Sequence, residues 1–255
     1  MNQFQGTVLV TGATSGIGRA TALRFAGPGV RVVAVGRNRE ALSKVAQAVE
    51  DHHGSVLTVV ADVTASEQRE QLVKTVLAAE PRVDCLVNAA GVIASGTIDN
   101  TTLAAFEAMM GLNVTACLHL MQLCLGELTN RRGSVVNVSS VAGLRSFPGI
   151  LAYSVSKAAL DQLTRCTALE VAARGVRVNA VNPGVVITEL HRRGGMDDTA
   201  YTSFLERSKT THPLGRPGEA AEIADLIYFL ASPAASWITG VTYSIDGGRA
   251  LTCAR

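Results

Sequence analysis

The chain has 255 residues, of which 47% are hydrophobic and 17% are charged, and its formal net charge at pH 7 is +2. This composition supplies enough apolar residues for a large core and excludes an intrinsically disordered chain. The near-neutral charge and the aromatic content of 4% give no sign of a nucleic-acid-binding or membrane-surface protein. We therefore expect one folded domain over residues 1–255.

Strand-like and helix-like segments alternate along the chain. The expected strands span 7–11, 30–35, 56–60, 83–88, 134–138, 176–181 and 241–245. The expected helices run to about 25, then over 40–51, 67–79, 153–173 and 219–230, with two more inside 103–128 that meet near Gly111. Alternation of this kind predicts right-handed βαβ units. The fold class is therefore α/β: a doubly wound Rossmann fold with a seven-stranded, mostly parallel sheet and helices on both faces.

The segment 188–217 lacks a strand pattern and contains several glycines and prolines. Long irregular segments of this sort are often mobile covers of a binding site, so we predict a substrate lid here. The alternative is a surface excursion that contains one helix.

The cysteines indicate a reducing environment. Their number is odd and no close pair has the spacing of a zinc site, so we predict no metal. Cys117 and Cys124 lie seven residues apart on an expected helix, which is typical of small core residues. We expect a cytoplasmic protein. No uninterrupted apolar run reaches the ~18 residues of a membrane span, and the residues before the first strand are too few for a signal peptide. The five cysteines are Cys85, Cys117, Cys124, Cys166 and Cys253.

A glycine-rich turn follows the first strand. Gly12, Gly16 and Gly18 stand between that strand and the next helix. Such a turn lets the backbone approach a pyrophosphate, which the free N–H groups at the helix N-terminus stabilise. The alternative is a tight strand-to-helix turn without a ligand.

The residues after the second strand bear on the choice of cofactor. An acid at this place binds the ribose 2′-hydroxyl of NAD, whereas an arginine receives the 2′-phosphate of NADP. Here Gly36 stands where the acid would be, and Arg37 follows it. The planar guanidinium suits a phosphate, so we predict NADP(H), with NAD(H) as the alternative. Arg37 could otherwise be a solvated loop residue.

Tyr153 and Lys157 lie one turn apart on an expected helix, so a phenol and an ammonium share one face. A nearby cation lowers the pKa of a tyrosine, and a proton donor works best when its pKa approaches the working pH. The pair is therefore a candidate general acid. The spacing is also common on solvated helices.

Taken in order, these motifs resemble the classical short-chain dehydrogenase/reductase family, and are similar to its 3-oxoacyl-(acyl-carrier-protein) reductases. Thr11, Gly12, Gly16 and Gly18 match the glycine motif, and Tyr153 and Lys157 match the Y-x-x-x-K motif. Ser140, thirteen residues before Tyr153, matches the catalytic serine. The resemblance implies that Asn113 completes the catalytic set Asn113, Ser140, Tyr153 and Lys157. One departure is Ala89, where the family usually has a second asparagine.

The resemblance also implies a set of cofactor contacts. Asp62 would contact the adenine, although it could simply cap the segment that follows, and Thr188 would contact the carboxamide of the nicotinamide. The full set is Gly12, Ser15, Gly16, Ile17, Gly18, Arg37, Asp62, Val63, Asn88, Ala90, Gly91, Tyr153, Lys157, Pro183, Gly184, Val186 and Thr188.

The implied function is reduction of a ketone or 3-oxoacyl group to a secondary alcohol. Tyr153 would protonate the developing alkoxide, Lys157 would lower the pKa of Tyr153 and bind the ribose, and Ser140 would donate a hydrogen bond to the substrate oxygen. Asn113 would hold a water that links Lys157 to solvent. An NAD-dependent secondary-alcohol dehydrogenase and a non-catalytic NADP(H)-binding protein are the alternatives. The expected partners are a small carbonyl or alcohol substrate and further copies of the chain, in a homotetramer or homodimer, with no nucleic acid or membrane.

Overall fold

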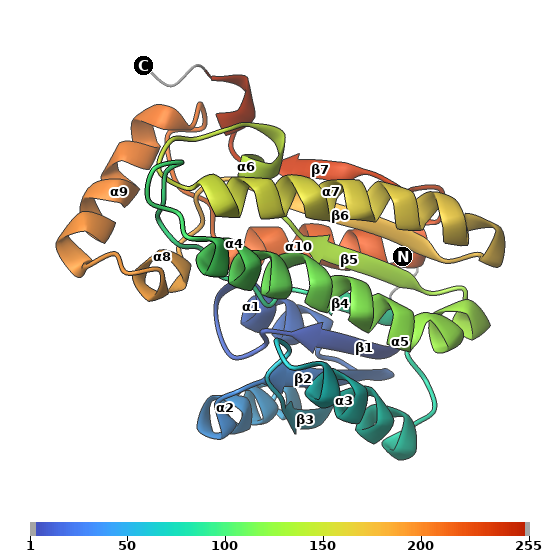
Figure 1. The fold of residues 1–255 in the computed structure, drawn as a ribbon. Coiled ribbons are helices and arrows are strands. Elements are labelled where there is room, and N and C mark those ends of the chain that lie inside the picture. Colours follow the sequence, from blue (N-terminus) through green and yellow to red (C-terminus); the bar gives the residue numbers. More distant parts are fainter. Residues whose placement is uncertain (1–3, 253–255) are drawn as a thin grey trace.

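A sheet of seven parallel strands forms the centre of the protein (Figure 1). The computed structural model describes residues 4–252. The strand order is β3-β2-β1-β4-β5-β6-β7, and every neighbouring pair is parallel, which confirms the predicted fold class. The strands are β1 (Gly6–Thr11), β2 (Val30–Gly36), β3 (Ser55–Val60), β4 (Cys85–Asn88), β5 (Ser134–Val138), β6 (Arg177–Pro183) and β7 (Thr242–Ile245).

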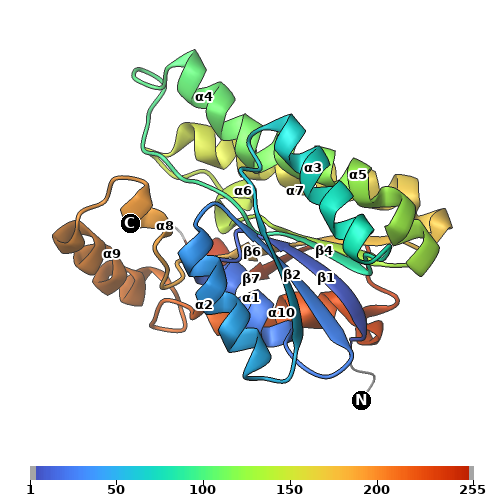
Figure 2. The ribbon, with the colours of Figure 1, turned by 90° about the horizontal axis from the view of Figure 1, so that it is seen from below.

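Helices cover both faces of the sheet (Figure 2). Helices α1, α2 and α10 lie on one face, and α3, α4, α5 and α7 lie on the other. The α-helices are α1 (Gly16–Phe25), α2 (Arg39–Glu50), α3 (Ser66–Ala79), α4 (Leu103–Met110), α5 (Ala116–Arg131), α6 (Val141–Leu144), α7 (Leu151–Val171), α8 (Leu190–Arg193), α9 (Asp198–Thr211) and α10 (Ala220–Ala231). Short 3-10 turns follow at Ala172–Arg174, Pro233–Ala235 and Arg249–Leu251.

The alternation of side chains along the strands divides the core into two. Val8 and Val10 of β1 face α1 and α10, where they pack with Phe25 and Ile227. Leu9, between them, points to the other face and packs with helices α3 and α5. Both faces of the sheet are apolar for this reason, as expected for a parallel sheet covered on two sides.

The chain order places a crevice at the carboxyl ends of the strands. From β1 the chain builds outward to β2 and β3, and then returns to add β4 on the other side of β1. In open parallel sheets this switch point is where ligands bind. The turns after β1, β4, β5 and β6 therefore meet above the same edge.

The two helices expected inside 103–128 are one continuous helical segment. Helix α4 runs into α5 through a π turn, Gly111–Thr115. Gly111 keeps helical angles (φ −55°, ψ −49°), so it does not break the helix as expected. A π turn holds one more residue than an α-helical turn and is often found at functional sites.

This segment also bears on the expectation about membrane spans. Counted through the π turn, Leu103–Arg131 is long and apolar enough to cross a membrane by length and composition, with a mean hydropathy of 1.5. This criterion admits polar and charged residues, such as Glu107, so it differs from the uninterrupted apolar run that the sequence was predicted to lack. The same segment buries Leu120, Met121 and Leu128 against the sheet, which is also the behaviour of a core helix.

The segment 188–217 is more regular than expected. It contains two helices, α8 and α9, rather than one, and they stand beside the carboxyl ends of the strands (Figure 1). Asp197 caps α9 by accepting a hydrogen bond from the backbone N–H of Ala200 at 2.8 Å. Helix α6 was not expected either. The mobility of the segment 188–217 as a substrate lid stays a prediction.

The cysteines behave largely as expected. Cys117 and Cys124 are buried, which confirms their place in the core, and burial raises the pKa of the Cys117 thiol to about 11 and that of Cys124 to about 12. Within residues 4–252 the cysteines are free, and Cys166 is exposed. Cys253 lies outside the described residues.

Candidate active site

The crevice above the sheet is a cleft of about 990 Å³. The turns after β1, β2, β3, β4, β5 and β6 border it, together with helices α8 and α9. A cleft of this size is large enough for a dinucleotide and a small substrate side by side. No group of three or more His, Cys, Asp or Glu residues could hold a metal ion anywhere within residues 4–252.

The glycine turn after β1 depends on the absence of side chains. Gly12 has a φ of +66°, and a Cβ there would lie 2.9 Å from the backbone of Ala90. A Cβ on Gly18 would lie 2.3 Å from the carbonyl oxygen of Gly12. Both contacts are with backbone, which cannot move aside cheaply. The first turn of α1 therefore comes close to the end of β1, and its unpaired N–H groups border the cleft.

Thr188 lies opposite this turn. A Cβ on Gly16 would lie 3.1 Å from the Cγ2 of Thr188. The hydroxyl of Tyr201 on α9 fixes Thr188 from both sides, because it accepts from the Thr188 N–H at 3.2 Å and donates to the Thr188 carbonyl at 2.9 Å. The first residue of the segment 188–217 is thus hydrogen-bonded to helix α9 of the same segment.

Arg37 and Asp62 stand at the other end of the cleft. Arg37 follows β2 and Asp62 follows β3, and a guanidinium nitrogen of Arg37 lies 3.8 Å from a carboxylate oxygen of Asp62. The Arg37 side chain is 74% exposed, so this pair contributes only about 0–1 kcal/mol. Arg37 is consequently available to a ligand.

Asp62 also makes the local cap that was the alternative to a cofactor contact. Its Oδ1 accepts from the N–H of Thr64 at 2.9 Å and from the Thr64 hydroxyl at 2.8 Å. The backbone N–H of Thr64 is the main cause that holds the pKa of Asp62 below its usual value. Asp62 therefore stays ionised while it lines the cleft.

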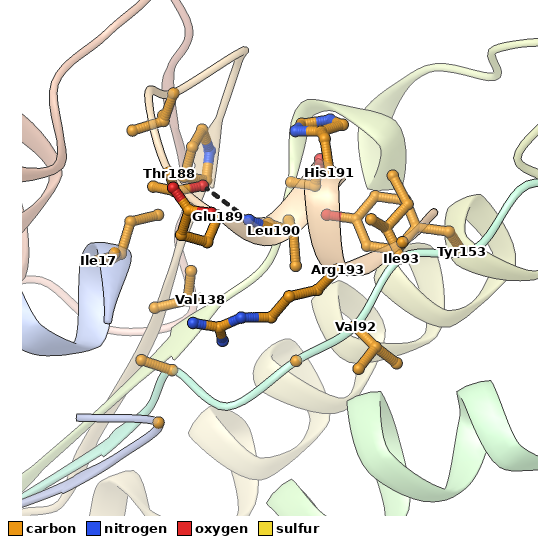
Figure 3. A pocket seen from close by; sticks show the side chains of 18 of the residues that line it. Ile17, Val92, Ile93, Val138, Tyr153, Thr188, Glu189, Leu190, His191 and Arg193 are labelled. Carbon is orange, nitrogen blue, oxygen red and sulfur yellow. Dashed lines mark hydrogen bonds between the residues drawn. The ribbon is translucent and has the colours of Figure 1, made fainter. Parts of the chain in front are cut away.

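Tyr153 and Lys157 occupy one face of α7 at the inner wall of the cleft (Figure 3 shows Tyr153). The Lys157 amine donates to the carbonyl of Val138, at the end of β5, at 2.8 Å. It lies 5.7 Å from the centre of the Tyr153 ring. Ser140 caps α6 by accepting from the N–H of Ala142 at 3.1 Å, which places its hydroxyl beside Tyr153.

Burial dominates the titration of this pair. It raises the pKa of Tyr153, and the Ser140 hydroxyl offsets only part of that increase. It also lowers the pKa of Lys157. The expected lowering of the Tyr153 pKa by Lys157 stays a prediction, because burial outweighs the other influences on Tyr153 in the protein chain by itself. The reason is that a low-dielectric wall penalises the phenolate and the ammonium alike, and the amine is turned toward the Val138 carbonyl.

Asn113 lies beneath the cleft rather than in it. It is fully buried in the π turn. Its amide oxygen accepts from the N–H of Val92 at 3.1 Å, and its amide nitrogen donates to the Val92 carbonyl and to the Ser156 hydroxyl, both at 3.0 Å. The side chain is therefore a tie between the turn after β4 and helix α7. The predicted water that links Lys157 to solvent stays a prediction.

The side chain of Asn88 lies inside the protein. It donates to Asn137 at 2.8 Å, and Asn137 donates in turn to Thr164 of α7 at 2.9 Å. This chain of hydrogen bonds lies inside the protein, so the Asn88 side chain does not border the cleft. The Asn88 side chain is therefore turned away from the cleft, and its predicted cofactor contact stays a prediction. The physical reason is strand alternation, which turns Asn88 to the same face as Leu86.

The turn after β4 remains anchored although Ala89 replaces the usual asparagine. The Thr11 hydroxyl oxygen accepts from the N–H groups of Ala89 and Ala90, both at 3.1 Å. The other predicted cofactor residues border the cleft, namely Ser15, Ile17, Val63, Ala90, Gly91, Pro183, Gly184, Val186 and Thr188.

Further basic side chains border the cleft. His191, Arg193 and Arg207 belong to the predicted lid, and Arg249 lies outside it. His191 and Arg193 come from α8, and Arg193 extends across the cleft in Figure 3. The His191 ring packs on Phe204 with 4.5 Å between ring centres, and burial lowers its pKa, so the imidazole is neutral. Arg207 and Arg249 come from α9 and from the C-terminal 3-10 turn. The basic run His191-Arg192-Arg193 was a visible signal for the first pair.

A Rossmann sheet with a glycine turn after β1 and a Tyr–Lys pair at the same cleft defines a dinucleotide-dependent oxidoreductase. The sequence profile described as enoyl-(acyl carrier protein) reductase matches residues 12–250. The chain belongs to the short-chain dehydrogenase/reductase family, whose members bind NAD(P)(H) and act on CH–OH groups.

Several known proteins are similar over nearly the whole chain. The 3-oxoacyl-(acyl-carrier-protein) reductase of Thermotoga maritima is 36% identical over 241 residues, which cover 94% of this chain and 96% of that one. L-xylulose reductase of Caenorhabditis elegans is 35% identical over 243 residues, 94% of each chain. Glucose 1-dehydrogenase of Gluconobacter oxydans is 36% identical over 250 residues, which cover 96% and 91%.

A solved structure agrees with the fold. The crystal structure of a short-chain dehydrogenase/reductase of unknown function from Caenorhabditis elegans, with cofactor, has a TM-score of 0.92 and 36% identity. It covers 97% of this chain and 96% of that one. The names of these similar proteins refer to different substrates. The similarity therefore identifies the family, and the substrate has to be inferred from the residues of the site.

Proposed function

We propose that this enzyme is an NADP(H)-dependent reductase that converts a ketone or 3-oxoacyl group into a secondary alcohol. The observation that carries the proposal is one cleft with Arg37 at its outer end and Ser140, Tyr153 and Lys157 at its inner wall. The first supports the choice of cofactor and the others support the chemistry. The similarity to a 3-oxoacyl-(acyl-carrier-protein) reductase supports the substrate class.

The residues divide the work of the reaction. When bound in the cleft, NADPH would supply the hydride that the carbonyl carbon accepts. As the carbonyl oxygen becomes an alkoxide, the Ser140 hydroxyl donates a hydrogen bond to it and Tyr153 transfers its proton to it, which gives the alcohol. Burial keeps Tyr153 protonated before this step. The Lys157 amine lies 5.7 Å from the ring centre and, in its protonated form, would stabilise the phenolate that remains.

The cofactor preference has a direct test. We expect the wild-type protein to bind NADPH much more tightly than NADH in a fluorescence titration at several salt concentrations. Arg37→Asp should remove this preference, because a carboxylate repels the 2′-phosphate and suits the free ribose hydroxyl. Equal or tighter binding of NADH by the wild type would instead favour an NAD-dependent alcohol dehydrogenase.

The catalytic role is tested separately. We expect Tyr153→Phe to keep NADPH binding and to lose roughly 10²–10⁴-fold in kcat for an acetoacetyl thioester, the usual range for a general acid. A crotonyl thioester, which offers a C=C bond, serves as the comparison substrate. If cofactor binding is the sole measurable activity and no carbonyl substrate turns over, the chain is a non-catalytic NADP(H)-binding protein.

We also propose a homotetramer or homodimer located in the cytoplasm. Large apolar side chains on α7 and near β7 support the association: Leu169 is 83% exposed and Trp237 is 99% exposed. Helix α7 also carries Tyr153 and Lys157, so an interface there would brace the catalytic residues from behind.

A further inference from the structure

The substrate end of the cleft carries unpaired positive charge. Arg207 and Arg249 border the cleft there. The carboxylates that border the cleft are Asp62 and Glu189. Asp62 stands at the far end beside Arg37, and Glu189 pairs with Arg192 at 3.0 Å. Neither of these acids neutralises Arg207 or Arg249.

Three segments of the chain converge at this end. The Arg145 guanidinium, just after α6, donates to the carbonyls of Ala250 and Thr252. The Thr252 hydroxyl donates in turn to the carbonyl of Thr211 at the end of α9, at 3.2 Å. The C-terminal turn is therefore held between α6 and α9, as its position in Figure 1 agrees. Arg249 is fixed within this arrangement by a 3.1 Å hydrogen bond to the Thr252 hydroxyl.

The arginines repel one another. Arg145 and Arg207, together with burial as the larger cause, lower the pKa of Arg249. Asp246 is an opposing charge that acts on Arg249, but its oxygens accept from the backbone N–H groups of Gly248 at 3.0 Å and Ala250 at 2.7 Å. Within residues 4–252, no ion pair joins Arg145, Arg207 or Arg249 to a carboxylate. These positive charges repel one another at the edge of the cleft. An anion that binds between them would replace this repulsion by attraction, so the cleft favours an anionic ligand.

An apolar patch connects these arginines to the catalytic wall. Phe147 and Ile150 are partly buried and pack against the small core cluster that contains Tyr153. The guanidinium of Arg249 lies 4.9 Å from the centre of the Phe147 ring. Phe147 therefore contacts both the cluster that contains Tyr153 and the guanidinium of Arg249. A ligand that starts at Tyr153 and follows this patch arrives at Arg249.

We propose that the substrate carries an anionic group, a carboxylate or a phosphate, which Arg249 and Arg207 bind while its carbonyl lies at Tyr153. This inference rests on the proposed reductase function and specifies its substrate class. The carbonyl and the anion are separated by a short apolar stretch that lies over Phe147 and Ile150. Arg145 is a positioning residue, since its guanidinium holds the turn that carries Arg249.

Paired substrates test the proposal. The first series consists of methyl ketones with a terminal carboxylate and increasing chain length, such as levulinate, each compared with its neutral methyl ester. The second pair is acetoacetyl-coenzyme A, which carries phosphates, and the neutral N-acetylcysteamine thioester of acetoacetate. The measured quantity is the ratio of kcat/KM for the charged substrate to that for its neutral partner, with NADPH as reductant.

We expect the charged member to be preferred in at least one pair, and the pair that shows it identifies the anion as a carboxylate or a phosphate. Arg249→Gln and Arg207→Gln should each reduce this preference by roughly ten- to a hundredfold, mainly through KM, because each removes a charge-assisted hydrogen bond. Arg249→Lys should keep part of it. Arg174→Gln is the matched control, since Arg174 is exposed at the far end of α7 and does not border the cleft.

Binding without turnover separates this proposal from the proposed function. Calorimetric titration of levulinate and of inorganic phosphate into the NADP⁺ complex measures the anion site directly. Binding that Arg249→Gln removes, in a protein that reduces no ketone, would support the anion site and contradict the reductase assignment. Equal kcat/KM for charged and neutral partners, or a preference that Arg249→Gln leaves intact while NADPH still binds, would overturn the proposal.

Discussion

At the scale of single residues, the catalytic wall is governed by burial. Tyr153 and Lys157 are 6% and 4% exposed, and burial favours the neutral form of each. A neutral phenol is the form that gives a proton to an alkoxide. The unliganded protein is therefore prepared for reduction, and a charge that arrives with substrate or cofactor changes this balance.

The pH dependence of the reaction follows from these shifts. Because burial raises the pKa of Tyr153, its phenol stays protonated through neutral pH. We expect kcat/KM for reduction to be level near neutrality and to fall as the pH rises through that pKa, whereas oxidation of the alcohol should become faster over the same range. Initial rates in both directions across pH measure this.

A reduction rate that already falls at a pH well below the ordinary tyrosine value of about 10 would contradict the role of Tyr153 as an acid whose pKa is raised. Ser140→Ala provides the matched comparison. Its loss removes the hydroxyl that favours the phenolate, so the fall should move to higher pH.

At the scale of elements, the π turn between α4 and α5 secures the floor of the cleft. We expect Asn113→Ala to leave the backbone N–H and carbonyl of Val92 without their partner, at a cost of about 1–3 kcal/mol. For a domain of this size each kcal/mol lowers Tm by about 2–4 °C. Thermal unfolding followed by circular dichroism measures the loss.

Asn113→Ala should also lower kcat, because Ser156 loses a hydrogen bond beside Lys157. Asn130→Ala is the control, since its amide bonds the exposed Glu127 at the end of the same helical segment. If the Asn113→Ala protein has the same Tm as the wild type, the hydrogen bonds of Asn113 do not contribute to stability.

The sequence predicted the elements whose signal is local. Apolar β-branched runs marked the strands, and the glycine turn stood directly between β1 and α1. The π turn was not predicted, because one extra residue in an apolar helix changes its hydrophobic pattern too little to be recognised. Asn88 was assigned to the cleft by motif, although alternation along β4 already placed it on the face of Leu86.

The residues of the substrate end could not be found in this way. Arg249 reaches the cleft only because the C-terminal turn returns to α6 and α9, which is a tertiary contact with no local signature. His191 and Arg193 were inside the predicted lid, but their direction depended on a helix, α8, of only four residues.

At the scale of the whole molecule, exposed apolar residues predict association. Association would bury the exposed apolar side chains of Leu169 on α7 and Trp237 before β7. Full burial of one such side chain contributes on the order of 1.5–3 kcal/mol. We expect the wild type to sediment as a tetramer or dimer, and Leu169→Glu to shift it to a smaller species. Sedimentation velocity at several concentrations measures the masses.

Val60→Glu is the control for this prediction, because Val60 is 44% exposed on β3, the edge of the sheet opposite β7. A wild-type protein that sediments as a monomer at all concentrations would contradict the proposed association. A Val60→Glu protein that dissociates as readily as Leu169→Glu would place the interface elsewhere.

The π turn also limits how this chain can change over evolutionary time. Each residue of an α-helix rotates the next side chain by about 100°, so deleting one residue within Gly111–Thr115 would restore a regular helix and turn α4 by that angle relative to α5. Asn113 would then face away from Val92. Single-residue insertions or deletions should be tolerated in the loops of this chain and rejected here.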